Sequence, residues 1–75
     1  MIDKNDIITF NNGEYLVVSK VEYENLTYLY LVDIIDNTNI KFVSVDNDEV
    51  VIVTDNDLLN KLFKLIINDL KSDLI

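Results

Sequence analysis

The sequence predicts an α+β fold, in which an antiparallel β-meander of about five short strands precedes one C-terminal amphipathic helix. Two observations lead to this prediction. Apolar residues alternate with polar ones along five short segments between residues 6 and 53, and turns rich in Asn and Asp separate these segments. Beyond residue 54, the apolar residues recur at helical spacing. With 75 residues, of which 32 are Ile, Leu, Val or Phe, we expect a single folded domain spanning residues 1–75.

The first two predicted strands form a hairpin. Residues Asp6–Phe10 alternate, and Asn12-Gly13 then offers the two positive φ angles that a type I′ turn requires. The second strand, Glu14–Tyr23, is apolar on both faces in its first half and on one face in its second half. This pattern is typical of a long, bent strand in a partly covered sheet.

Three further strands are predicted at Thr27–Ile35, Ile40–Val45 and Val50–Val53. Their short polar connections leave no room for a helix between strands, so neighbouring strands should pair antiparallel. We expect the sheet to curl toward a small, partly closed, SH3-like barrel.

The predicted helix runs from about Thr54 to Leu74. Thr54 and Asp57 resemble a capping box, and the wheel shows an apolar arc of about 200°, although packing on one surface needs only about 100°. We therefore expect part of the arc to stay uncovered and to form an interface. Its edges are Leu58 and Leu65 on one side and Ile67 and Leu74 on the other.

The composition argues against an enzyme. The chain has no Cys, His or Arg, which removes thiolate and imidazole metal ligands, His-based catalysis and bidentate anion clamps. Its single Gly also excludes a phosphate-binding loop. Two segments that begin at Asp46 and Asp55 open like calcium loops, but both lack the Gly and the Glu that such a loop requires. We expect no catalytic residues, no bound metal and no cofactor.

Fourteen acidic residues against six Lys give a net charge of −8, which argues against direct binding to nucleic acid or to anionic membranes. Acidic residues in loops and at strand ends can instead imitate the phosphates of a nucleic acid and attract a basic protein. The candidate residues are Asp33, Asp36, Asp46, Asp48, Glu49, Asp55 and Asp57. The alternative is that these side chains only solvate the surface.

The four Tyr residues, at positions 15, 23, 28 and 30, also allow two interpretations. They can line a groove for a ligand or peptide, or they can form the cross-strand aromatic pairs that commonly stabilise sheets. The N-terminal residues show no apolar signal segment and no apolar run is long enough to span a bilayer, so we expect a cytoplasmic protein.

Four segments together resemble the YrzB-like family, a group of small acidic domains of unknown function from low-GC bacteria. They are Asn12–Val18, Tyr28–Val32, Lys41–Val43 and Val53–Leu59. The family has no established catalytic residues, so the resemblance implies no activity. In size and charge the chain also resembles phage-encoded inhibitors such as anti-CRISPR proteins.

Two functional hypotheses follow. In the first, the chain is an acidic protein-interaction module that inhibits or regulates a basic, nucleic-acid-handling protein. In the second, it is a structural or accessory subunit that forms a homodimer through its C-terminal helix.

Overall fold

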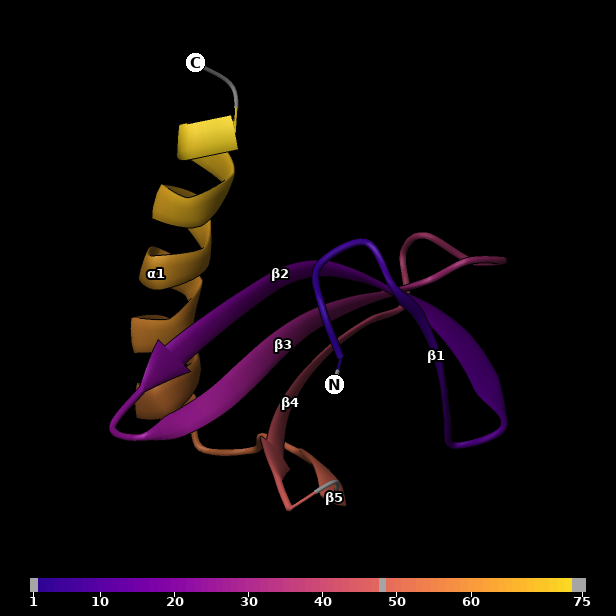
Figure 1. Cartoon of the computed structure of the whole chain (residues 1–75), viewed down its shortest axis with the longest axis horizontal. Coiled ribbons are helices and arrows are strands. Elements are labelled where there is room, and N and C mark those ends of the chain that lie inside the picture. The colour runs from indigo at the N-terminus through magenta and orange to yellow at the C-terminus, as the bar shows by residue number, and fades with distance from the viewer. Residues whose placement is uncertain (1, 48, 74–75) are drawn as a thin grey trace.

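The computed structural model describes residues 2–47 and 49–73, and it confirms the predicted α+β meander with a C-terminal helix (Figure 1). The strands form one antiparallel sheet in the order β1-β2-β3-β4-β5, so each strand pairs with its neighbours in sequence. The elements are β1 (Ile7–Phe10), β2 (Gly13–Tyr23), β3 (Leu26–Asp33), β4 (Ile40–Asp46), β5 (Glu49–Ile52) and α1 (Asn56–Asp73).

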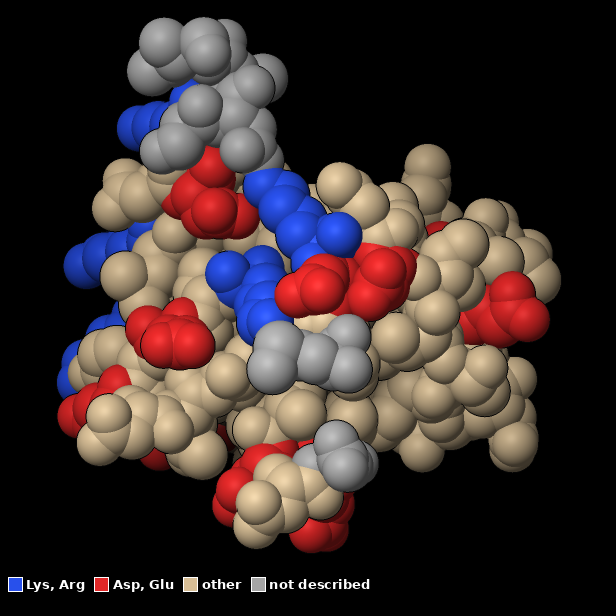
Figure 2. Space-filling model, in the orientation of Figure 1, with Lys and Arg blue, Asp and Glu red and all other residues tan. Residues whose placement is uncertain are grey.

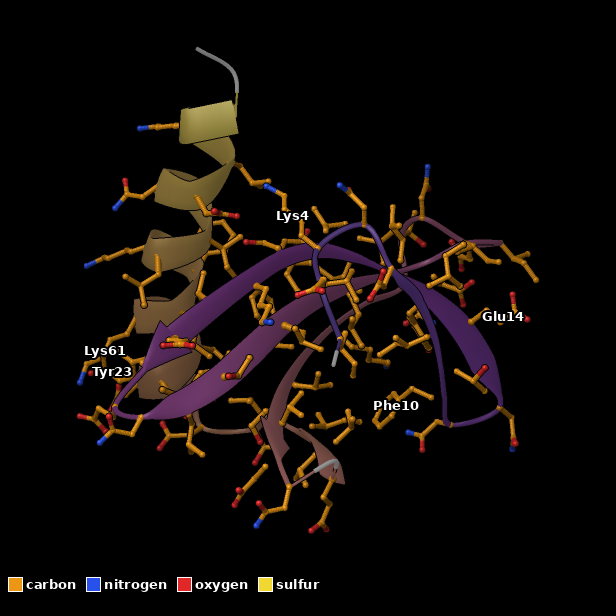
Figure 3. The ribbon with its side chains drawn as sticks, in the orientation of Figure 1. Lys4, Phe10, Glu14, Tyr23 and Lys61 are labelled. Carbon is orange, nitrogen blue, oxygen red and sulfur yellow. The ribbon has the colours of Figure 1, made fainter. Side chains whose placement is uncertain are left out.

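The sheet curls into a half-barrel whose concave face holds the main core. Tyr15, Val17, Leu29, Leu31 and Val43 are buried there, and partly buried apolar side chains of the N-terminal segment, β1, β4 and β5 pack against them. The rings of Phe10 and Tyr15 meet edge to face with their centroids 6.2 Å apart. In Figure 3, Phe10 points into the space enclosed by the curl. The two halves of the curled sheet therefore bury each other's inner side chains.

A β-bulge at Val18 explains how β2 buries side chains on both faces of the sheet. Val17 pairs with Leu31, but Ser19 pairs with Tyr30, so β2 has one extra residue between the two pairs. Because paired residues point to the same face and neighbours alternate, Val17 and Ser19 lie on opposite faces. Regular alternation would put Val17 and Ser19 on the same face, and the bulge is the reason for the difference.

Helix α1 packs on the convex face, against β2. Its Leu62 and Ile66 are fully buried, as is Ser19 on the convex face of the sheet, and Tyr28 on the same face is buried as well. Figure 1 shows α1 crossing behind the second half of β2. The helix thus covers part of the convex face, and the curl encloses the core on the concave face.

The helix begins one residue later than the predicted capping box implied. Asp55, not Thr54, is the N-cap, because its Oδ1 accepts hydrogen bonds from the backbone N–H groups of Asp57 and Leu58 at 2.9 and 3.2 Å. Asp57 lies in the first turn, where the helix dipole favours negative charge.

The first hairpin also differs from the prediction by one residue. The two positive φ angles belong to Asn11 (49°) and Asn12 (64°), and Phe10 pairs with Gly13, so Gly13 is already part of β2. Gly13 is needed for space instead, because a Cβ atom there would lie 3.1 Å from a ring carbon of the buried Tyr15. The pair Asn11-Asn12 satisfies the turn because Asn tolerates the left-handed conformation.

The second hairpin contains a residue that is poorly suited to its conformation, and this gives a testable prediction. Glu24 has φ 51° between the paired residues Tyr23 and Leu26. Changing Glu24→Asn should raise the free energy of unfolding by about 0.5 to 1 kcal/mol relative to Glu24→Gln, since Asn adopts this conformation at lower cost. Both variants lose the same charge. Equal unfolding free energies in urea titrations would contradict the explanation.

Candidate interaction surfaces

The seven acidic candidates do not form one continuous surface. Asp33 and Asp36 lie at the loop between β3 and β4, whereas Asp46 lies at the opposite end of β4, since Val45 pairs with Thr27 near the start of β3. The eight residues of β3 separate the two ends by roughly 25 Å. In Figure 1 the β3–β4 loop lies at the upper right, and the β4–β5 turn and the start of α1 lie below. Asp48 lies outside the described residues.

Three of the candidate carboxylates organise the backbone around them. Asp33 accepts hydrogen bonds from the N–H groups of Ile35 and Asp36 and from Asn39 Nδ2, at 2.8, 3.2 and 3.1 Å. These bonds hold the pKa of Asp33 below its usual value, with Ile35 making the largest contribution. Asp36 accepts from the N–H and the hydroxyl of Thr38, and Asp55 caps the helix. The structure therefore gives these residues a local role that sequence alone had left open.

Asp46, Glu49 and Asp57 are different. All three are exposed, and none accepts a side-chain hydrogen bond from another residue in the ranges 2–47 and 49–73. Asp46 and Glu49 face each other directly across the β4–β5 ladder, where like charges are destabilising. The charges of Asp46 and Glu49 therefore have no stabilising role among the described contacts, whereas Asp57 lies in the first turn of α1, where negative charge is favourable. All three carboxylates remain candidates for contact with a partner.

The apolar arc of α1 is less exposed at its edges than the sequence indicated. Leu58, Leu65 and Ile67 are half-buried, and Leu74 lies outside the described residues. The exposed side chain is instead Phe63, with 51% of its surface accessible. Phe63 lies next in sequence to the buried Leu62, which rotates it by about 100° away from the centre of the packed face. A wheel centred on Leu62 and Ile66 would have identified it.

The tyrosines have mainly structural roles. Tyr15 and Tyr28 are buried, and Tyr30 packs against Phe42 across the β3–β4 pair with ring centroids 5.1 Å apart. Tyr15 and Tyr30 thus form aromatic ring pairs between strands, and Tyr28 is buried beside Val21 and Ser44, which supports structural roles for these three over a ligand groove.

Sequence reasoning missed a polar cluster that joins the two ends of the chain. The buried Ser19 Oγ donates a 2.6 Å hydrogen bond to Asp69 Oδ2 in α1, and Lys4 Nζ lies 3.4 Å from the same oxygen. The Ser19 hydrogen bond holds the pKa of Asp69 below its usual value, against the opposing effect of burial, and Lys4 adds to this. No sequence signal indicated the pairing, because it depends on the bulge that turns Ser19 toward the helix.

The concave face carries a pocket of about 430 Å³. Ile2, Leu29 and Val45 contribute apolar walls, and Lys20, Glu22, Thr27 and Asn47 contribute polar ones. Lys20 Nζ forms an ion pair with Asp3 Oδ1 at 3.2 Å. The charges at this pocket are of both signs, so it does not select strongly for a cation or an anion.

Charge is distributed unequally between the two parts of the chain. Residues 1–55 contain eleven acidic residues and three Lys, for a net −8, whereas residues 56–75 contain three of each and are neutral overall. The three helix lysines, Lys61, Lys64 and Lys71, are all exposed. Figure 2 shows blue side chains along the outer side of the helix and red ones at the β4–β5 turn. The strand region thus carries the whole net charge.

Among residues 2–47 and 49–73, no helix is both long and apolar enough to cross a membrane. Within those same ranges, Asp and Glu do not gather in groups of three or more that suit a metal ion. Comparisons with protein-family models, with curated proteins and with solved structures found no match to this chain. The resemblance to the YrzB-like family stays a prediction.

The polar cluster predicts an acid-sensitive contribution to stability. Ser19→Ala should lower the free energy of unfolding by about 1 to 2 kcal/mol at neutral pH, since a hydrogen bond to a carboxylate is lost and Asp69 is about one-third exposed. Because the folded-state pKa of Asp69 is lowered, this contribution is complete above the ordinary Asp pKa of about 4 and is lost as the pH falls through the lower folded value.

Urea unfolding of both proteins at about pH 7 and about pH 3 measures the effect. The difference in unfolding free energy between the parent chain and Ser19→Ala should be smaller at the acidic pH. Ser44→Ala is the control, because the half-buried Ser44 hydroxyl donates to the carbonyl of Val51 at 3.5 Å and not to a carboxylate. An equal narrowing in Ser44→Ala would show that the Asp69 carboxylate is not responsible.

Proposed function

We propose that this chain is a non-enzymatic protein-interaction module that binds a basic partner, and that it inhibits or regulates a nucleic-acid-handling protein. The observation that carries the proposal is the charge distribution, since the strand region holds the entire net charge of −8 and the helix region holds none of it. A field of one sign over part of a surface steers association with a partner of opposite sign.

The exposed carboxylates of Asp46, Glu49 and Asp57 support this proposal. They make no hydrogen bonds within the described part of the chain, and Asp46 and Glu49 oppose each other across a strand pair. A basic protein that came between them would relieve this repulsion. A protein that normally binds phosphates presents lysines and arginines suited to such a contact.

Affinity capture from a lysate of a low-GC bacterium tests the proposal. Proteins retained at about 50 mM salt should be basic, should elute at about 500 mM salt and should be displaced by excess DNA, because ionic contacts between exposed groups are screened. The triple variant Asp46→Asn, Glu49→Gln, Asp57→Asn should retain them less well. Retention that neither salt nor DNA changes would contradict an acidic imitation of nucleic acid.

The alternative, a homodimer formed through the helix, is favoured by the exposure of Phe63. A half-exposed Phe beside the half-buried Ile67 is a surface that a second helix can cover.

If the helix forms the dimer, the parent chain should sediment as a dimer and Phe63→Ser should shift it to a monomer without loss of helical circular dichroism. Asn60→Ser, at another exposed position of α1, should leave the dimer intact. A parent chain that sediments as a monomer at high concentration would rule out this alternative.

A further inference from the structure

The convex face of the sheet carries a continuous row of apolar side chains that the helix does not cover. Ile7 pairs with Leu16, Leu16 with Val32, and Val32 with Ile40. Because directly paired residues point to the same face, these four side chains form one line across β1, β2, β3 and β4. We call this line the apolar row.

The apolar row lies on the same face as α1 but beyond it. Val32 is two residues from Tyr30, which pairs with the buried Ser19, so the row and the helix-covered residues share a face. Ser19 is completely buried, whereas Ile7 and Ile40 are 59% and 44% exposed. The helix therefore covers one part of the convex face and leaves the part nearer the β3–β4 loop open.

Two more exposed isoleucines lie at this end of the sheet. Ile34 and Ile35 follow directly after β3 and are 47% and 92% exposed, and the Ile34 N–H donates to the Glu14 carbonyl at 3.1 Å. Four of the eight large apolar residues that are exposed in the described chain thus gather at this one end. A contiguous apolar patch on a small acidic protein is a common sign of a binding surface.

The charges beside the apolar row are negative. Glu14 is two residues from Leu16 on the same face of β2, and Asp36 lies in the loop that follows β3. Asp33, the last residue of β3, pairs with Tyr15 and therefore points to the concave face. Figure 3 shows Glu14 directed outward at the end of the sheet away from the helix. Lys41 pairs with Leu31 and therefore points to the opposite, concave face. Asp36 is held in place by the hydrogen bonds that it accepts from Thr38, so this part of the negative border is organised before any partner arrives.

We propose that the apolar row is the docking surface for a protein segment whose apolar side chains are bordered by lysine or arginine. This inference rests on the proposed function and adds the surface and the form of the partner. The apolar centre excludes water, and the carboxylates at the border select for basic residues and align them. A second copy of this chain fits less well, because symmetric pairing of two such faces would bring the same carboxylates together.

A synthetic amphipathic helix made of leucine and lysine serves as the probe, with an all-lysine peptide of equal length as the charge-only comparison. Chemical shifts of backbone amides and isoleucine methyl groups locate the bound peptide. Shifts should concentrate at the apolar row and the β3–β4 loop. The leucine–lysine peptide should bind more tightly than the all-lysine peptide.

Two pairs of matched variants separate apolar from ionic contacts. Changing Ile7 and Ile40 together to Thr keeps β-branched side chains and leaves the charge unchanged. It should weaken the binding of the leucine–lysine peptide by about tenfold. Val51→Thr, at a 49% exposed position on β5, should not weaken it. Glu14→Gln should weaken both peptides, whereas Glu22→Gln at the concave pocket should not. If the double Thr variant does not fold, the comparison of Glu14→Gln with Glu22→Gln still tests whether the peptides bind at the apolar row.

Other outcomes overturn the inference in distinguishable ways. Binding that maps to Asp46, Glu49 and Asp57 and survives the double Thr change would leave the proposed function standing with a different surface. Shifts in the apolar row that depend on protein concentration without any peptide would identify a second copy as the occupant. If neither peptide binds at low salt, both the inference and the proposed function are wrong.

Discussion

The structure depends on one constraint, which is that a single curled sheet has to bury apolar side chains on both of its faces. The bulge at Val18 meets this constraint by changing the alternation of β2 halfway along its length. Before the bulge, β2 sends Tyr15 and Val17 into the concave core, and after it Ser19 turns toward α1. A regular strand would have carried Ser19 into the apolar core and left the helix without its polar contact. The polar contact between the sheet and α1 follows from this extra residue.

The order and type of the elements could be predicted from the sequence because they depend on local patterns. All five strands and the helix begin and end within about two residues of the predicted ranges. After the bulge in β2, however, the side chains point to the opposite faces from those that regular alternation gives. The differences arise where tertiary contacts decide. Gly13 serves the ring of Tyr15 and not the turn, and Asp55 caps the helix because its carboxylate reaches two N–H groups. The bulge, and with it the pairing of Ser19 and Asp69, depends on the register between β2 and β3, which a single sequence does not specify.

The candidate surfaces were predicted less completely, for a related reason. Acidic residues were recognised by type, but their roles depend on what their oxygens contact. Asp33, Asp36 and Asp55 stabilise loops and a helix end, whereas Asp46, Glu49 and Asp57 face solvent. The apolar row was hidden in the sequence because its members come from four strands, and each strand contributes only one residue. Only strand pairing shows that these side chains are neighbours.

The sequential order of the strands has a consequence for how the molecule forms. Every strand can pair as soon as its predecessor exists, and two of the hairpins need to close loops of only two residues, at positions 11–12 and 24–25. Loops this short close at little entropic cost, so these two hairpins can form from local contacts. Helix docking is the non-local step, since Asp69 has to find Ser19 fifty residues earlier. During synthesis the strands emerge first, and the two faces of the sheet are therefore completed at different times.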